Sequence, residues 1–257
     1  MSKSKTFWGA FGWLFVAILF LCILTLFFYL WGKPDHVDDP IPAVGNAEDA
    51  PCSDTDRDIV FYCKRNDNME IALTFDDGPH PYYTPLILDI LDEYGIKATF
   101  FMIGENVKYY SKAAEEVIAR GHEVGNHTYN HKTLKPLGEY DILREIQACE
   151  DEIFALGEYH PKLVRPPEGS MNQQVKDVVG SLNYRIILWD LDTKDWAHTP
   201  PCDISRHILD EVTAGDIILM HDFIGHNSPT PEALRQFIPE LLSRGYKFVT
   251  VSELLDG

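Results

Sequence analysis

Short apolar runs alternate with amphipathic segments from residue 69 to residue 251, and this alternation constrains the fold more than any other feature. The runs are short and partly β-branched, which predicts buried strands, and the segments between them carry apolar residues at helical spacing. We expect strands over Met69–Asp76, Ala98–Gly104, His122–Gly125, Lys162–Arg165, Arg185–Leu191, Asp216–Met220 and Lys247–Val251. We expect helices over Tyr83–Tyr94, Ser111–Arg120, Asp141–Leu156, Gln173–Leu182, Asp203–Val212 and Pro231–Arg244. Such alternation predicts a parallel α/β sheet, either open and doubly wound or closed into a barrel.

The residues before this body have a different character. Residues 7–31 carry no charge, are long enough to cross a bilayer core of about 30 Å, and have aromatic side chains near both ends. Lys3 and Lys5 precede the run and acids follow it, which favours a cytoplasmic N-terminus. We therefore expect a cytoplasmic segment over 1–6, a single transmembrane helix over 7–31, an extracytoplasmic linker over 32–66 and a folded domain over 67–257, at the cell membrane. A cleaved signal peptide is the alternative, although its apolar region is normally only about 7–15 residues long.

Charge and cysteine content limit the classes of binding partner and the cellular compartment that we expect for this chain. The net charge of −18 disfavours nucleic acid, whose binding depends on neutralising phosphates. The five cysteines form no CxxC pair, so a thiolate zinc site is not expected. Outside the cytoplasm, Cys52, Cys63, Cys149 and Cys202 would face oxidising conditions. Cys52 and Cys63 could bridge, whereas Cys149 lies in a helical pattern and could equally be a buried free thiol.

Clusters of polar residues follow the predicted strands at one end only. In parallel α/β folds the carboxyl ends of the strands meet at one rim, where reactive loops lie. The clusters at these ends are Asp76 and Asp77, His127 and His131, Arg165, Asp192 to Trp196, and His221 with Asp222. The sequence therefore predicts a chemical site at that rim.

A metal site is one interpretation of the polar residues at this rim. His127 and His131 are four residues apart, so on a helical turn they would share a face, as two imidazoles on one ion require. With a carboxylate from the first strand end they would complete a catalytic-type site with an open position. We expect a divalent metal ion, zinc first, with cobalt or manganese as alternatives. Two surface or capping histidines would explain the same spacing.

The remaining rim residues fit acid–base chemistry. Gly78-Pro79 ends the first strand, so Asp76 and Asp77 can both turn to the rim, one as a ligand and the other as a general base. A pair of solvated turn acids is the plain alternative. His221 can donate a proton, with Asp195 as its partner, although a structural histidine is common. Arg165 can orient a carboxylate through a bidentate pair or form an ordinary ion pair.

Five ordered motifs, taken together, resemble carbohydrate esterase family 4, the polysaccharide deacetylases with a NodB homology domain. The motifs are TFDDG at Thr74–Gly78, NHTYNH at Asn126–His131, RPPEG at Arg165–Gly169, DTKDW at Asp192–Trp196 and IILMHD at Ile217–Asp222. GIKATFFMIG at Gly95–Gly104 also looks like the family. The resemblance covers about residues 67–257 and implies a distorted (β/α) barrel rather than an open sheet.

The resemblance also implies how the metal and the base are divided among the rim residues. It implies Asp76 as the general base and Asp77, His127 and His131 as the metal ligands. The metal is then a resident divalent cofactor of a hydrolase.

Further roles follow from the same resemblance. It implies that Arg165 orients the general base, that Asp195 tunes His221, and that His221 is the general acid. It implies that Trp196 and Leu219 wall a small pocket for the acetyl methyl group, although ordinary core packing would account for both side chains.

One position departs from the family pattern. An aromatic residue usually follows the two prolines, and here Glu168 stands in its place. The backbone N–H of Glu168 can still serve an oxyanion hole. The resemblance thus implies retained catalysis and leaves substrate preference open.

The expected function is a metal-dependent hydrolase that removes N-acetyl groups from an extracytoplasmic polysaccharide. Peptidoglycan N-acetylglucosamine is the leading substrate, because cell-wall glycan is the nearest polymer to such an anchored domain. N-acetylmuramic acid, chitin oligomers and acetylated xylan are alternatives within the family. A non-catalytic glycan-binding protein on the same fold, or a membrane protein that assembles through its anchor, would be a different class.

Overall fold

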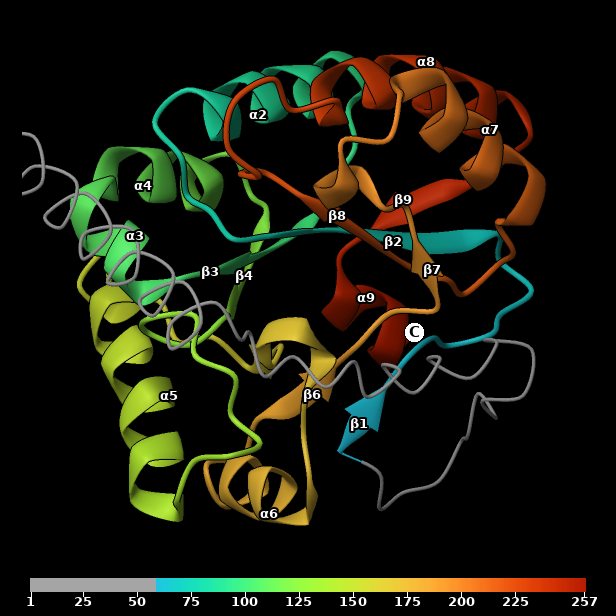
Figure 1. The fold of residues 1–257 in the computed structure, drawn as a ribbon. Helices are drawn as coiled ribbons and strands as arrows, with labels where there is room; N and C mark the ends of the chain where they lie inside the picture. The colour runs from blue at the N-terminus through green and yellow to red at the C-terminus, as the bar shows by residue number, and fades with distance from the viewer. Residues whose placement is uncertain (1–58) are drawn as a thin grey trace, which may run out of the picture. The chain divides into compact units, whose positions relative to one another are not determined.

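The computed structural model describes residues 59–257, in which nine strands form one curled sheet (Figure 1). The strands are β1 (Val60–Phe61), β2 (Glu70–Asp76), β3 (Thr99–Met102), β4 (Glu123–Asn126), β5 (Leu163–Val164), β6 (Arg185–Ile187), β7 (Leu191–Asp192), β8 (Ile217–His221) and β9 (Lys247–Val249). Their order is β1-β6-β5-β4-β3-β2-β8-β7, with β9 also on β2, and every strand pair is parallel. The predicted parallel α/β architecture is confirmed, and the sheet curls into an incompletely closed barrel.

Helices cover the outside of this sheet, except for the last one along the chain, which packs on its inner side (Figure 1). They are α2 (Tyr83–Tyr94), α3 (Gly104–Tyr109), α4 (Ser111–Ala119), α5 (Glu139–Phe154), α6 (Gln173–Ser181), α7 (Pro201–Glu211), α8 (Thr230–Ser243) and α9 (Val251–Asp256). Short 3₁₀ turns lie at Pro167–Gly169 and Asp195–Ala197. Helix α8 packs against both α2 and α7, and α5 packs against α3 and α6.

The strand predicted over Arg185–Leu191 is two strands in the structure. Strand β6 pairs with β1 and β5, whereas β7 pairs with β8 at the opposite end of the strand order. Residues 188–190 carry the chain between the two, so a single continuous strand was the wrong prediction. The break between the two strands is not visible in the sequence, because the apolar run continues through it. Leu188 and Trp189 are apolar since they pack against the core, although they belong to neither strand.

Three short elements were not predicted from the sequence pattern. Strand β1 lies within the stretch predicted to be a linker, and it pairs with β6, so the ordered sheet begins before residue 67. Helices α3 and α9 have six residues each, too few to display a helical period. Helix α9 is fixed by a capping box in which Thr250 and Glu253 satisfy each other's backbone N–H groups.

Alternation along β2 separates an outer core from the barrel interior. Ile71, Leu73 and Phe75 pack outward with the apolar faces of α2 and α8, in the largest core cluster. Ala72 points the other way and packs with Phe101 and with α9. Asp76 follows on this inner side at the same period of two, so the pleat of β2 aims its carboxylate toward the barrel axis.

Several predictions concern residues that the structure does not describe. The transmembrane helix over 7–31 lies outside residues 59–257, as does Cys52 and hence its bridge to Cys63. Within residues 59–257, the helices are all too short or too polar to cross a bilayer. Cys149 is a buried free thiol, as one of the two alternatives predicted, and its Sγ lies 3.3 Å from the carbonyl oxygen of Met102. Cys202 is an exposed free thiol.

Candidate active site

Three ligand-type side chains meet at the carboxyl ends of β2 and β4. Atoms of Asp77, His127 and His131 that could bind a metal all lie within 4.8 Å of one another. Asp77 Oδ1 is 3.4 Å from His127 Nε2 and 3.1 Å from His131 Nε2. His127 Nδ1 lies 2.7 Å from the carbonyl oxygen of Arg165. Since a carbonyl only accepts, Nδ1 carries the proton and Nε2 presents its lone pair to the cluster.

The Asp77 carboxylate fits a divalent ion. Its Oδ1 is buried and has no hydrogen-bond partner of adequate geometry among residues 59–257, although two imidazole nitrogens lie close by. Burial by itself raises the pKa of Asp77, but the two histidines outweigh it and hold the pKa well below its usual range. Contact with Asp77 raises the pKa of His131. One carboxylate and two imidazoles, one of them buried and one partly exposed, form a donor set that suits zinc, cobalt or manganese.

The backbone at these ligands is irregular. Asp77, Thr128 and His131 adopt positive φ angles of 73°, 66° and 54°. The left-handed conformation of Asp77 turns its side chain to the rim, where a regular strand would direct it away from its neighbour Asp76. The two histidines meet through a loop rather than on the helical turn assumed from their spacing. Non-glycine residues in this conformation are uncommon and often mark functional sites.

Glu145 on α5 fixes the loop between the two histidines. Its carboxylate accepts hydrogen bonds from the Asn130 N–H (2.9 Å) and from Lys132 Nζ (2.8 Å). Burial favours protonation, but these donors outweigh it and lower the pKa of Glu145. Sequence reasoning missed Glu145, because an acid in an amphipathic helix normally faces water.

Asp76 lies beside the cluster and is paired with a buried arginine. Arg165 Nη1 donates to Asp76 Oδ1 (2.7 Å) and to Thr74 Oγ1 (2.8 Å). Arg165 Nε and Nη2 donate to the carbonyl oxygens of Ile187 (3.1 Å) and Leu188 (3.0 Å). Complete burial lowers the pKa of Arg165 and the negative charge of Asp76 opposes this. The pair thus uses one guanidinium nitrogen rather than the bidentate contact considered from sequence, and the other nitrogens anchor the guanidinium to the backbone.

His221 and Asp195 form a second charged pair. His221 Nδ1 lies 2.8 Å from Asp195 Oδ1, and the His221 backbone N–H donates to Asp195 Oδ2 (2.8 Å). Thr230 Oγ1 also donates to Oδ2 (2.7 Å), and the Trp196 N–H donates to Oδ1 (2.9 Å). Burial lowers the pKa of His221, but Asp195, helped by the charges of Asp76 and Asp77, outweighs it and raises the pKa to about 9.

Strand register places the two charged pairs side by side. Asp76 on β2 is the parallel partner of His221 on β8, so both side chains leave the same face of the sheet. Leu219, two residues before His221, pairs with Thr74 and is buried below this position. Trp196 is 53% exposed, and its Nε1 donates to Asp192 Oδ1 at 3.4 Å. Leu219 therefore lies in the floor of the rim and Trp196 at its surface.

Glu168 occupies a tight turn after the two prolines. Its φ of 59° is left-handed, and its side chain is exposed, with Oε2 accepting from Thr133 Oγ1 at 3.3 Å. The carboxylate thus points into solvent beside the loop that carries His131.

Two further contacts were not anticipated from the sequence. Asn106 on α3 donates through Nδ2 to the carbonyl oxygen of Asp77 (2.8 Å) and fixes the left-handed turn. Asp222 is buried and accepts a hydrogen bond from Thr84 Oγ1, and its carboxylate packs so closely on Gly78 that a Cβ there would overlap it. Burial raises the pKa of Asp222 to about 7. Thr84 and Asn106 lie in ordinary helices, so only the fold reveals these contacts.

The fold and this rim define a class of protein: an α/β barrel with two buried charged pairs, Asp76–Arg165 and His221–Asp195, beside a candidate metal cluster. The family model for polysaccharide deacetylase matches residues 64–187. A peptidoglycan-N-acetylglucosamine deacetylase of Bacillus cereus is 40% identical over 192 residues, which cover 74% of this chain and 90% of the relative.

Solved structures agree with the sequence relatives. The Bc1960 peptidoglycan N-acetylglucosamine deacetylase is 34% identical, with a TM-score of 0.73 over 76% of this chain and 92% of that one. A family 4 acetyl xylan esterase from Clostridium thermocellum, in complex with a cobalt ion, is 34% identical, with a TM-score of 0.69 over 73% of this chain and 90% of that one. This chain belongs to the polysaccharide deacetylases of carbohydrate esterase family 4, which is a family of hydrolases, and the predicted resemblance is confirmed.

Proposed function

We propose that this protein hydrolyses the N-acetyl groups of amino sugars in a polysaccharide outside the cytoplasm, most directly the N-acetylglucosamine of peptidoglycan. One observation carries the proposal. The Asp76–Arg165 pair and the His221–Asp195 pair leave adjacent strands on the same face, next to the cluster of Asp77. Amide hydrolysis requires a general base and a general acid that can both reach one reacting group.

Asp76 is the proposed general base. Its Oδ2 lies 3.8 Å from His127 Nε2, so this oxygen borders the metal cluster while Oδ1 is held by Arg165. The arginine fixes the orientation of the carboxylate. Asp76 then removes the proton of the water that attacks the acetyl carbonyl.

His221 is the proposed general acid. Asp195 fixes the proton on Nδ1 and stabilises the imidazolium, which leaves Nε2 free to donate. With its pKa raised to about 9, His221 is protonated at neutral pH in the metal-free protein. It can therefore protonate the departing sugar amine, which cannot leave as an anion.

Asp77, His127 and His131 are the proposed ligands of a divalent ion, with zinc first and cobalt or manganese as alternatives. Such an ion, when bound, supplies Lewis-acid activation of water and of the acetyl carbonyl. His127 is oriented for this by the Arg165 carbonyl.

The remaining residues would hold the acetyl group. We propose that the Glu168 N–H donates to the oxyanion that develops on the acetyl carbonyl. Leu219 in the floor of the rim and Trp196 at its surface would enclose the methyl group. With Glu168 in place of an aromatic ring, the surface beside the loop of His131 has one apolar side chain fewer, which bears on sugar preference.

The choice of glycan rests on similarity and on the proposed location. The Bacillus cereus relative is named for peptidoglycan N-acetylglucosamine. The apolar run of residues 7–31, proposed as a single-pass anchor, would hold the domain against cell-wall glycan. N-acetylmuramic acid, chitin oligomers and acetylated xylan are the alternative substrates.

Acetate release from a panel of glycans tests the proposal. The full-length chain, solubilised in detergent and loaded with zinc, is incubated with peptidoglycan, N-acetylglucosamine oligomers and acetylated xylan. We expect acetate from peptidoglycan, with mass loss on the N-acetylglucosamine residues, and none from a His221→Ala variant. Release from xylan alone would change the substrate to an O-acetyl ester. No release from any glycan, with zinc bound and the protein folded, would favour the non-catalytic glycan-binding alternative.

A further inference from the structure

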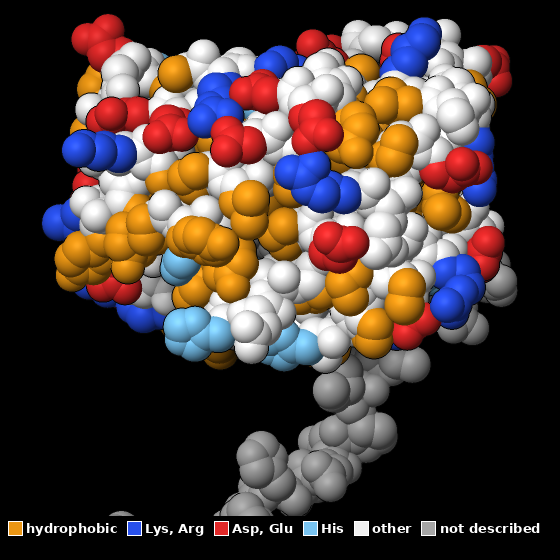
Figure 2. All heavy atoms as spheres, turned by 90° about the horizontal axis from the view of Figure 1, so that it is seen from above, with side chains coloured by type: hydrophobic (Ala, Val, Ile, Leu, Met, Phe, Trp, Pro, Cys, Tyr) orange, Lys and Arg blue, Asp and Glu red, His pale blue; other side chains and the backbone are white. Residues whose placement is uncertain are grey.

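Exposed tyrosines gather next to the candidate active site. Tyr82, Tyr109 and Tyr110 are 65%, 69% and 39% exposed, respectively, although tyrosine normally buries most of its ring. Figure 2 shows hydrophobic side chains gathered on one side of this face, near histidine side chains. Clustered exposed aromatic rings often mark a binding surface.

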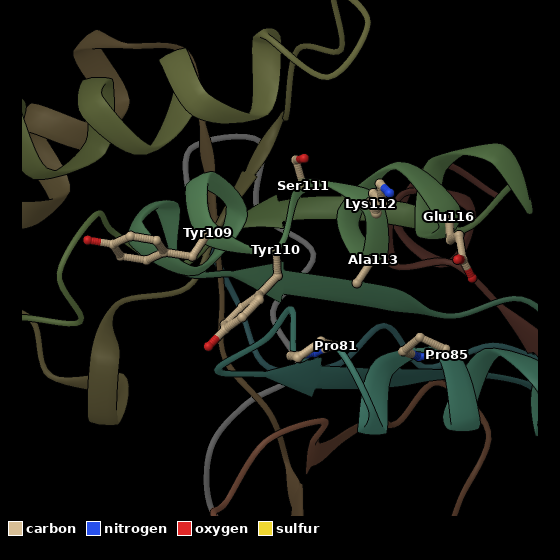
Figure 3. Close-up of a pocket in the computed structure, with 8 residues that line it drawn as sticks. All are labelled: Pro81, Pro85, Tyr109, Tyr110, Ser111, Lys112, Ala113 and Glu116. Carbon is tan, nitrogen blue, oxygen red and sulfur yellow. The ribbon is translucent and has the colours of Figure 1, made fainter.

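Two of these tyrosines, Tyr109 and Tyr110, line a shallow cleft (Figure 3). Pro81 and Pro85, at the start of α2, form one side, and residues 109–113 with Glu116, at the junction of α3 and α4, form the other. Its volume of about 470 Å³ falls in the range of small-molecule sites. Tyr110 extends toward Pro81 in Figure 3, so its ring forms part of an apolar surface inside the cleft.

The cleft lies near the proposed catalytic rim. Pro81 follows Asp77 by four residues, which limits their separation to about 14 Å. Helix α3, which ends at Tyr109, is bound to the Asp77 carbonyl by Asn106. His80, between the two sites, stacks on Phe223 with ring centroids 4.4 Å apart and lies 6.2 Å from the Tyr110 ring.

The chemistry of the cleft suits a sugar ring. A pyranose has a face of C–H groups, which packs on an aromatic ring, and an edge of hydroxyl groups, which need hydrogen bonds. Tyr110 and Pro81 supply the apolar surface, and Ser111, Lys112 and Glu116 supply donors and acceptors at its border.

We propose that this cleft is a glycan subsite that binds a sugar ring of the same polysaccharide a few residues away from the ring being deacetylated. The inference rests on the proposed function, since it assigns the cleft to that substrate. A subsite of this kind lowers KM for long oligomers and leaves short ones unaffected, because only a long chain reaches from the rim to Tyr110.

Chain-length dependence tests the subsite. Full-length Tyr110→Ala is compared with wild type on N-acetylglucosamine oligomers from dimer to hexamer. We expect KM for the hexamer to rise about three- to tenfold, as the loss of one aromatic contact implies, with the dimer unchanged. Tyr110→Phe keeps the ring and should retain wild-type KM. Tyr140→Ala, at a 73% exposed tyrosine on α5 outside the cleft, is the matched control.

Binding separates this inference from the proposed function. Calorimetric titration of the dimer and hexamer into Asp76→Asn, with and without Tyr110→Ala, reports affinity without turnover. A hexamer that binds more weakly only in the Tyr110→Ala protein supports the subsite, even if no glycan is hydrolysed. Equal hexamer affinity in Asp76→Asn with and without Tyr110→Ala, together with an equal hexamer KM in wild type and Tyr110→Ala, would overturn it, provided that each protein has a native circular dichroism spectrum. Absent acetate release with intact hexamer binding would count against the deacetylase proposal alone.

Discussion

Replacing Asp195 with asparagine removes the negative charge that contacts the His221 ring. The hydrogen bond and charge of Asp195 are the main factors that oppose burial and raise the pKa of His221 to about 9. Without them, we expect the pKa to fall to about 6.5 or below, the ordinary value for histidine. A fall of the pKa by about two to three units corresponds to roughly 3 kcal/mol of lost preference for the imidazolium.

The catalytic consequence follows from the protonation state. At pH 7 most His221 side chains of Asp195→Asn would be neutral and could not protonate the leaving amine. The asparagine NH₂ group would also face Nδ1 or displace the Thr230 hydrogen bond, so the ring would lose its fixed tautomer. We expect kcat to fall by about 10² to 10⁴, as for the equivalent change in other acid–base pairs.

Two measurements check this prediction. NMR titration of the metal-free protein should place the His221 midpoint near 9 in wild type and at or below 6.5 in Asp195→Asn. In the zinc-loaded enzyme the activity loss should be larger at pH 8 than at pH 6. Thr230→Val, which removes a hydrogen bond and keeps the charge, is the control and should move the midpoint much less. An unchanged His221 midpoint in Asp195→Asn would refute the reasoning.

Three other outcomes are expected. Burial lowers the pKa of His122 to about 4. The contribution of His122 to the free energy of unfolding is therefore fully present above pH 6.5 and is lost as pH falls toward 4. The contribution of His122, measured by urea unfolding as the difference between wild type and His122→Gln, should fall by about 2 kcal/mol between pH 7 and pH 5, because other titrating groups such as Asp222 act alike in both proteins. Arg165→Met leaves Asp76 as an unpaired buried charge and should cost about 3–5 kcal/mol by the same assay, whereas Arg235→Met at an exposed ion pair should change little. Chelation should abolish acetate release and lower Tm, zinc should restore both, and His131→Ala should show no rise of Tm with zinc.

Sequence periodicity predicted the long elements and failed on the short ones. Helix α2 was predicted over its observed range and β2 to within one residue, because each is long enough to display its own period. Strand β1 has only two residues, too few to display a period, and its place in the sheet depends on β6, more than 100 residues away along the chain. The break between β6 and β7 depends in the same way on β8, which no local pattern encodes.

The residues of the candidate site that directly follow a predicted strand could be predicted from the sequence. Asp76, Asp77 and His221 were found because a charged group directly after a buried apolar run is unusual, and their convergence follows from parallel topology. Glu145 and Thr230 were missed because they lie on amphipathic helices, where polar residues are ordinary. The positive φ angles that turn Asp77 and the histidine loop inward leave no trace in residue spacing.

The assignment of Asp76 as base and Asp77 as ligand is the central claim, and Asp76→Asn tests it most directly. Acetate release from N-acetylglucosamine oligomers is measured together with the zinc content of the same protein sample. Our account predicts that Asp76→Asn keeps one equivalent of zinc and loses acetate release, whereas Asp77→Asn loses both. An Asp76→Asn protein that still deacetylates, or one that loses its zinc, would contradict it.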